Sequence, residues 1–262
     1  RDTSPWGVMV SEYMLQQTPV NRVLPKWNEW MERWPTPKDL AKATPAQVIT
    51  AWGRLGYPRR ALRLHSAAQI IAEDFNNTVP EDQETLQLLP GIGEYTAAAI
   101  AAFAFEQRSL VMDVNIRRLL VRAIDGEEHP KPTPTAKEKA RRLAILPDKN
   151  AHVWAAATME LGALVCTSKN PSCELCPIIG QCQWRKNGYP KTDLVRKSQD
   201  WHGTDRKCRG TIVQALRDNE SLTESAIKKL WPDESQVEKA LKTLANDLLI
   251  QKLPRNRYRL PQ

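Results

Sequence analysis

Four of the five cysteines gather within seventeen residues, where their thiolates could hold a metal centre. They are Cys166, Cys173, Cys176 and Cys182, and their spacing is C-x6-C-x2-C-x5-C. Nothing in the sequence resembles a secretory signal, so a metal or cluster site is expected rather than a set of disulfides. Zinc sites usually contain two C-x2-C pairs, whereas one such pair with longer outer gaps favours a [4Fe–4S] cluster. The fifth cysteine, Cys208, is expected to be an ordinary free thiol.

A single carboxylate, Glu12, stands in the otherwise apolar helical pattern of "SEYMLQQTPV", residues 11–20. At 100° per residue, Glu12 falls between Val8 and Leu15, and apolar side chains cover the opposite side of the helix. A helix that is apolar nearly all round is expected to be buried, and Glu12 with it. The carboxylate could pair with an arginine. Alternatively, it could be a carboxylic acid that keeps its proton in a partly dry pocket for general acid catalysis.

The segment "LPGIGEYTA", residues 89–97, predicts a tight turn between two helices. Gly91 and Gly93 would let backbone N–H groups approach an anion at the N-terminus of the second helix. We expect that anion to be a DNA phosphate, with a plain corner between two helices as the alternative.

Asp113 is a second candidate for catalysis. It stands in "VMDVNIRRLL", residues 111–120, just ahead of a helical segment that carries Arg117, Arg118 and Arg122. Its position suits a helix N-cap, because a carboxylate accepts hydrogen bonds from the first backbone N–H groups of a helix. One residue can both cap a helix and take part in catalysis, so the two interpretations are compatible.

The segments around these residues are predominantly helical. Pro and Thr mark helix starts in "TPVNRV", "PTPKDLAKA", "TPAQVITAW" and "PTPTAKEKA". A long amphipathic stretch runs over residues 59–76, and residues 94–105 are rich enough in alanine for close helix packing. No β-strand alternation appears before residue 200, which predicts an all-α core.

The composition changes after Cys182. Residues 186–202 are polar and basic with several turn residues, and they predict a linker. Helical patterns resume in 208–262 and end in "IQKLPRNRYRL", a candidate two-stranded wing. Three helices and a hairpin predict a small winged-helix-like domain over 203–262. The basic residues of its wing, which could contact DNA phosphates, are Lys252, Arg255, Arg257 and Arg259.

The composition favours a polyanionic partner. The 262 residues include 38 Lys and Arg against 30 Asp and Glu, a formal net charge of +8, and the pI is 9.3. No apolar run reaches the roughly 20 residues of a membrane span, so a soluble intracellular protein is expected. Because the sequence begins at Arg1 without an initiator methionine, we expect that its natural N-terminus is missing.

Taken in order, these motifs resemble those of the helix-hairpin-helix DNA glycosylase superfamily, and within it the MutY-type adenine DNA glycosylases. The resemblance runs from about Pro5 to Cys182 and is carried by "SEYMLQQT", "AWGRLGY", "LPGIGEYTAAAI", "VMDVN", "MELGALVCT" and the cysteine spacing. It implies an all-α, two-lobed glycosylase core over residues 1–185 with an iron–sulfur cluster loop. The expected lobes are a six-helix lobe at about 18–124 and a cluster lobe of 1–17 plus 125–185.

The resemblance also implies roles for single residues. Glu12 matches the general acid that protonates N7 of the adenine, and Asp113 matches the carboxylate that stabilises the oxocarbenium-like sugar. Tyr95 and Asn115 match residues that support this pair. The residues implied to touch DNA are Gln17 and Tyr57, which wedge into the base stack, and Gly91 and Gly93, which grip the phosphate backbone. The four clustered cysteines would hold a [4Fe–4S] cluster.

Tyr95 stands where endonuclease III relatives carry a lysine for Schiff-base chemistry, so the resemblance implies a monofunctional glycosylase. The implied protein is a bacterial, cytoplasmic and nucleoid-associated monomer that excises adenine paired with 8-oxoguanine or guanine in double-stranded DNA.

Three positions depart from the family pattern, namely Pro58, Val114 and Ala156. Val114 and Ala156 leave a thymine or uracil mismatch glycosylase of the same superfamily as an alternative. A non-catalytic iron–sulfur DNA-binding regulator is a further alternative, for which the basic charge and the winged-helix-like tail argue.

Overall fold

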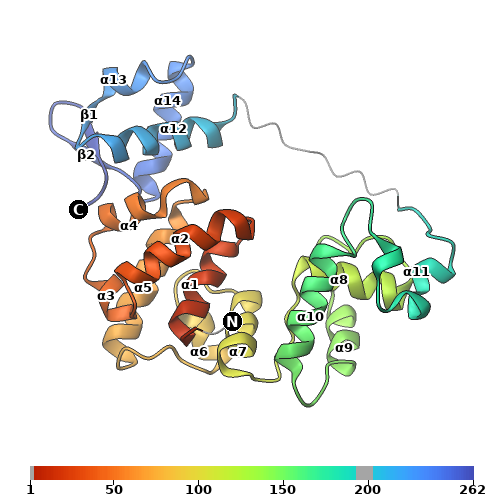
Figure 1. The fold of residues 1–262 in the computed structure, drawn as a ribbon. Coiled ribbons are helices and arrows are strands. Elements are labelled where there is room, and N and C mark those ends of the chain that lie inside the picture. Colours follow the sequence, from red (N-terminus) through yellow and green to blue (C-terminus); the bar gives the residue numbers. More distant parts are fainter. Residues whose placement is uncertain (1–2, 193–202) are drawn as a thin grey trace. The chain divides into compact units, whose positions relative to one another are not determined.

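The computed structural model describes residues 3–192 and 203–262, which form mostly helices (Figure 1). The elements of the first part are α1 (Pro5–Leu15), α2 (Val20–Arg33), α3 (Pro37–Ala41), α4 (Pro45–Trp52), the 3₁₀ turn η1 (Gly53–Leu55), α5 (Arg59–Asp74) and α6 (Gln83–Leu88). They are followed by α7 (Glu94–Phe105), α8 (Val114–Leu120), the π-helical turn η2 (Val121–Asp125), α9 (Ala136–Ala144), α10 (Ala151–Leu164), the 3₁₀ turns η3 (Cys173–Leu175) and η4 (Ile179–Gln181), and α11 (Gln183–Lys186). Among the described residues, no helix is long and apolar enough to cross a membrane.

The described residues form two compact units. One contains residues 6–80, 89–91 and 203–262, and the other contains 3–5, 81–88 and 92–192. In this division α1 groups with residues 20–74, and α7 and α8 group with the cysteine-bearing segment. The second grouping has a physical cause, since α7, α8 and α10 share one apolar core that consists of Ala99, Ala102, Val111, Ile116, Leu120 and Ala155. Of the predicted linker, residues 193–202 lie outside the described residues.

The helix starts that Pro and Thr predict are observed. The Thr36 hydroxyl accepts a hydrogen bond from the backbone N–H of Asp39 at the start of α3. Thr44 and Gln47 form a reciprocal capping box at the start of α4, where each side chain bonds the backbone of the other residue. These local bonds fix where the helices begin, and the helices then pack around Trp30. The Trp30 ring makes edge contacts with two further tryptophan rings.

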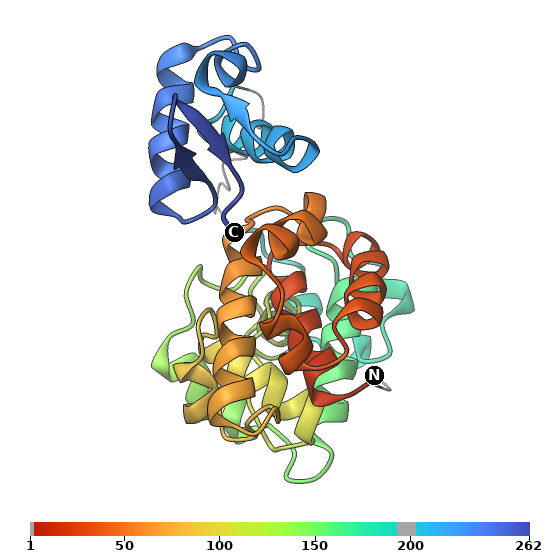
Figure 2. The same cartoon turned by 90° about the vertical axis from the view of Figure 1, so that its left-hand side faces the viewer.

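Residues 203–262 form a winged-helix-like domain, as predicted (Figure 2). Its elements are α12 (Asp205–Asp218), β1 (Leu222–Thr223), α13 (Glu224–Lys228), α14 (Glu234–Asn246), β2 (Gln251–Leu253) and β3 (Arg257–Arg259). The sheet has three antiparallel strands in the order β1-β3-β2, so the expected two-stranded wing gains β1 as a third strand. Cys208 is a free thiol and is fully buried in the core of this domain. That core also takes in Ile49 of α4, which belongs to the same compact unit.

Candidate active site and thiol cluster

Glu12 is buried in α1, as the sequence predicts, with only 2% of its surface exposed. From Trp6 to Met14 every residue of the helix except Ser11 is buried as well. This placement is the one that a general acid requires.

Arg60 holds the C-terminal end of α1. Its guanidinium donates to the backbone carbonyls of Tyr13, Met14 and Gln16 at 2.9, 3.1 and 2.5 Å, which are carbonyls that have no partner within the helix. Burial lowers the pKa of Arg60 to about 10, which still leaves it charged at neutral pH. The bonds fix the chain just before Gln17, whose backbone takes the left-handed conformation with φ of 57°.

The hairpin between α6 and α7 is tied to α1 through Tyr13. The Tyr13 hydroxyl donates to the carbonyl of Pro90 at 2.5 Å, and burial raises the pKa of Tyr13. The next residue, Gly91, has φ of +89°, and a Cβ there would lie 2.9 Å from Arg63 Cβ and 3.0 Å from the Tyr13 ring. Glycine is therefore required at position 91 by both conformation and space.

Gly93 stands at the N-cap of α7 under different constraints. Its φ of −101° suits any residue, and a Cβ there would meet no heavy atom within 4 Å. Packing therefore leaves the backbone at this helix start open to a ligand, which is the condition for an anion to reach its N–H groups.

Tyr57 is held in an exposed position by a buried framework. Its side chain is 41% exposed and its φ is 47°, between Gly56 and Pro58. The carbonyl of Gly56 accepts hydrogen bonds from Trp52 Nε1 and Arg60 Nη2, both at 2.9 Å. Because these donors are buried, the loop that presents the Tyr57 ring to solvent is rigid at its base.

The other compact unit carries Asp113 as the N-cap of α8, in agreement with the prediction. Its Oδ1 accepts the backbone N–H of Asn115 at 2.6 Å and that of Ile116 at 3.3 Å. Both bonds end on one oxygen of the carboxylate. The carboxylate of Asp113 therefore serves as the cap of this helix.

Asn115 and Tyr95 lie in the same unit as Asp113. The Asn115 side chain accepts from Arg118 Nη2 at 2.9 Å, and Arg118 also donates to the carbonyl of Cys166 at 2.7 Å. Tyr95 packs against the apolar core shared by α7, α8 and α10. A Cβ on Gly162 of α10 would lie 2.5 Å from the Asn115 carbonyl, so α10 and α8 are in close contact where Asn115 stands.

The predicted site residues therefore fall into two groups. One unit holds Glu12, Gln17, Tyr57 and Gly91, and the other holds Gly93, Tyr95, Asp113 and Asn115. In each group an arginine that the sequence did not indicate for this role makes the hydrogen bonds that hold the backbone or a site side chain in place. It is Arg60 in the first group and Arg118 in the second. The sequence does indicate that Arg60 is buried, because it lies on the apolar face of α5 with Leu64 and Ile71.

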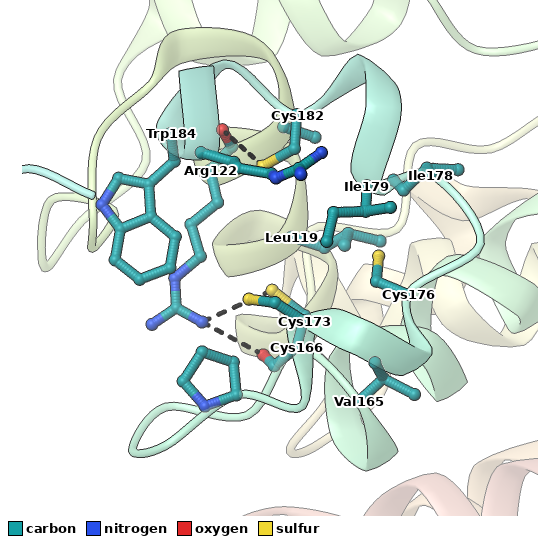
Figure 3. A pocket seen from close by; sticks show the side chains of 13 residues that line it. Leu119, Arg122, Val165, Cys166, Cys173, Cys176, Ile178, Ile179, Cys182 and Trp184 are labelled. Atoms are coloured by element: carbon teal, nitrogen blue, oxygen red, sulfur yellow. Dashed lines mark hydrogen bonds between the residues drawn. The ribbon is translucent and has the colours of Figure 1, made fainter. Parts of the chain in front are cut away.

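The four clustered cysteines line one cavity with apolar walls (Figure 3). Cys166 follows α10, Cys173 and Cys176 are brought together by η3, and Cys182 follows η4. Burial raises the pKa of the Cys173 and Cys176 thiols, and charge on the neighbouring cysteines raises it further. Four thiolates at this cavity would therefore need a cationic centre to hold them.

Arg122 supplies a buried positive charge beside these thiols. It is 1% exposed, and it donates to the Cys166 sulfur at 3.4 Å and to the Thr167 carbonyl at 2.7 Å. Its guanidinium also stacks over the Trp184 ring, 4.6 Å from the ring centroid. A buried cation whose acceptors are carbonyls and a sulfur suits an anionic group in the cavity.

Four cysteines are the donor set that a [4Fe–4S] cluster takes, and four cysteines can also hold zinc. In the part of the chain that the structure describes, no three His, Cys, Asp or Glu side chains are placed to hold one ion together. Four thiolates around a cluster each bind a different iron atom and stand further apart than around one zinc.

The family model and the relatives that match this chain are all described as base excision repair proteins or adenine DNA glycosylases. The family model for HhH-GPD superfamily base excision DNA repair proteins matches residues 10–144. The chain is 46% identical to adenine DNA glycosylase from Mycobacterium tuberculosis over 262 residues, which is 98% of this chain and 86% of that protein. It is 44% identical to adenine DNA glycosylase from Mycolicibacterium smegmatis, over 98% of this chain and 88% of that protein. Adenine DNA glycosylase from Homo sapiens is 41% identical over 71% of this chain and 34% of its own length.

Two solved structures share the fold at low sequence identity. A thermostable thymine-DNA glycosylase superposes with a TM-score of 0.62 and 21% identity, covering 71% of this chain and 89% of that one. A non-covalent endonuclease III–DNA complex superposes with a TM-score of 0.63 and 20% identity, covering 72% and 88%.

Proposed function

Because the chain belongs to the adenine DNA glycosylases of the HhH-GPD base excision repair superfamily, we propose that it excises adenine paired with 8-oxoguanine or guanine from duplex DNA. It is a DNA glycosylase, an enzyme that breaks an N-glycosidic bond. The observation that carries the proposed mechanism is the burial of Glu12, which is 2% exposed in a helix whose residues from Trp6 to Met14 are buried except Ser11. An acid that works near neutral pH must keep its proton, and burial favours that state.

In this mechanism Glu12 donates its proton to N7 of the flipped adenine. Protonation makes the base a better leaving group, so the bond between its N9 and the sugar breaks. The carboxylate of Asp113, at the N-terminus of α8, stabilises the oxocarbenium-like sugar, as the second carboxylate does in glycoside hydrolysis. Water then bonds through its oxygen to the anomeric carbon of the sugar and returns a proton to the Glu12 carboxylate, which completes the abasic site and restores the acid. Tyr95 has no amine with which to form a Schiff base, so the product is an intact abasic strand.

The residues proposed to touch DNA all follow the proposed acid in the sequence. Gln17 and Tyr57 would wedge into the base stack, where their left-handed backbones present them to solvent. Gly91 and Gly93 would place backbone N–H groups at a phosphate. This substrate implies association with the bacterial nucleoid.

We also propose that Cys166, Cys173, Cys176 and Cys182 hold a [4Fe–4S] cluster. The cluster would act as a cross-link that ties the loop after α10 to η3 and η4. Arg122, buried beside the thiols, offsets part of the negative charge. The proposed mechanism has no catalytic step at the cluster.

An excision assay on a panel of duplexes tests the proposal. The wild-type protein is incubated with duplexes that contain A:8-oxoguanine, A:G, T:G, U:G or A:T, and the released bases are measured. Adenine release from the first two alone is the expected result. Release of thymine or uracil instead would support the mismatch alternative, and release of no base from any duplex would support a non-catalytic DNA-binding protein.

A further inference from the structure

A wide groove lies within the compact unit that contains Tyr57 and the winged-helix-like domain. Its volume is about 1300 Å³, and α12 lines one wall with residues from Arg206 to Asp218. The opposite wall is lined by Gln16, Gln17 and the segment from Gly53 to Arg60, which includes Tyr57. The winged-helix-like domain therefore faces the loop that carries the proposed wedge residue.

The groove is strongly basic. Among the described residues, Asp218 is the one acidic side chain that lines it, whereas the basic lining residues are Arg22, Arg54, Arg59, Arg60, Arg63, Arg206, Lys207, Arg209 and Arg217. One of them, Arg217, donates to a neutral acceptor, the Ile49 carbonyl, at 3.1 Å. Asp247 forms ion pairs with Arg59 and Arg209, and its single negative charge offsets only a small part of the excess positive charge of the groove. A concave surface with this charge focuses a positive potential into the groove.

Arg206 links α12 to the wedge loop. Its guanidinium lies over the Tyr57 ring, 4.1 Å from the ring centroid, and both side chains are exposed. A guanidinium over an aromatic ring is attracted to the face of the ring, so the contact favours this placement of the charge. The first turn of α12 thus places a cation immediately beside the residue proposed to enter the base stack.

The basic residues of the wing make contacts inside their own domain. Arg257 donates to the Ser221 hydroxyl at 2.6 Å, and Arg259 donates to Gln251 at 3.1 Å. Lys252 lies over the Tyr258 ring. None of these side chains lines the groove. The basic surface that adjoins Tyr57 is therefore supplied by α12 and not by the wing.

We propose that this groove binds the sugar–phosphate backbone of duplex DNA, with α12 as the wall that the winged-helix-like domain contributes. The inference rests on the proposed function for its identification of Tyr57 as a wedge. It differs from the usual use of such a domain, since the helix that precedes β1 contacts the DNA and the wing does not. Contacts of this kind position DNA without reading its bases.

Two matched double variants test the assignment in the full-length protein. Arg206→Ala/Lys207→Ala removes two charges from α12, and Lys252→Ala/Arg255→Ala removes two from the wing. Binding of an undamaged duplex is measured at several salt concentrations. Each lost phosphate contact reduces the slope of log K against log salt by about 0.9, so the α12 variant should lose about 1.8 from the slope. The wing variant should keep the wild-type slope.

The two proposals can fail separately. Binding of undamaged DNA does not depend on adenine excision, which the duplex panel measures for the wild-type protein. An unchanged slope in the α12 variant, or a loss confined to the wing variant, would overturn the groove assignment. Thermal unfolding confirms that each variant is folded, and Arg206→Gln/Lys207→Gln replaces the alanine pair if that pair does not fold.

Discussion

The Tyr13 hydroxyl donates to the Pro90 carbonyl at 2.5 Å, so the helix that carries Glu12 is bonded to the loop that leads into Gly91. This hydrogen bond ties the helix of the proposed acid to the proposed phosphate-binding turn. A substitution in the turn should therefore also affect the position of Glu12. Substitutions of the two glycines of the turn separate an effect on folding from an effect on DNA binding.

Gly91→Ala should destabilise the protein by about 1–3 kcal/mol, because alanine is strained at positive φ and its Cβ would lie 2.9 Å from Arg63 Cβ. Gly93→Ala meets open space at ordinary φ and should cost less than about 1 kcal/mol. Its methyl group would instead stand at the N-terminus of α7 and weaken DNA binding. Denaturant unfolding and duplex binding measure the two effects. Equal stability of both variants would contradict the role given to Gly91.

Glu12→Gln should reduce adenine release by about 10²–10⁴-fold, because the amide keeps the shape of the side chain but cannot donate an acidic proton. Duplex binding should stay close to that of the wild-type protein. Glu94→Gln is the matched control, since Glu94 is an exposed carboxylate paired with Lys139. Single-turnover excision of adenine from A:8-oxoguanine measures the effect. Full activity of Glu12→Gln would remove Glu12 from the mechanism.

Much of this arrangement follows from local sequence rules. The N-cap of Asp113, the start of α4 at Thr44 and the bounds of α7 depend on bonds within a few residues, so they could be predicted from the sequence. The clamp of Arg60 on α1 could not, because it joins residues more than forty positions apart. The grouping of α8 with α10 is also non-local, since it depends on the close approach of Gly162 to Asn115.

The shortest elements also escaped prediction, for a related reason. β1 has two residues, too few for any alternation of apolar and polar side chains, and its pairing with β3 joins Leu222 to Tyr258. Similarly, nothing in the pattern of α12 alone indicates that Arg206 lies over Tyr57.

His65 should make stability depend on pH. Burial lowers its pKa, and hydrogen bonds to the backbone at Ala43 and Ala41 oppose that shift in part. The unfolded chain therefore binds a proton at a higher pH than the folded protein does. The stability linked to His65 is complete above the unfolded pKa of about 6.5, and it is lost as the pH falls below that value, by up to about 1.4 kcal/mol for each pH unit.

Denaturant unfolding between pH 5 and 7.5 measures this effect, with His65→Gln as the comparison, because glutamine keeps an N–H donor but does not titrate. The variant should show a shallower loss of stability below pH 6.5 than the wild-type protein. Parallel curves for the two proteins would show that His65 is not the group responsible.

Purified protein should contain four irons per chain, the number in a [4Fe–4S] cluster, and should absorb near 400 nm. Cys176→Ser should lower both the iron content and the soluble yield, because η3 and η4 are short turns whose arrangement depends on the cysteines. Cys208→Ala should keep the iron, since Cys208 is buried in a different core, although the lost volume should cost some stability. Metal analysis that finds one zinc and no iron would refute the cluster.

Deletion of residues 203–262 should weaken binding to A:8-oxoguanine and A:G duplexes by similar factors. The deletion removes the α12 wall of the groove, whose basic side chains would contact phosphates, and phosphates are the same in both duplexes. It also uncovers Ile49, which is fully buried against the winged-helix-like domain, so a lower thermal midpoint is expected. The ratio of the two affinities is the informative quantity, because a general loss of stability affects both duplexes alike. If the truncated protein lost A:8-oxoguanine binding selectively and kept A:G binding, the domain would read the lesion itself, and phosphate contacts would not account for its role.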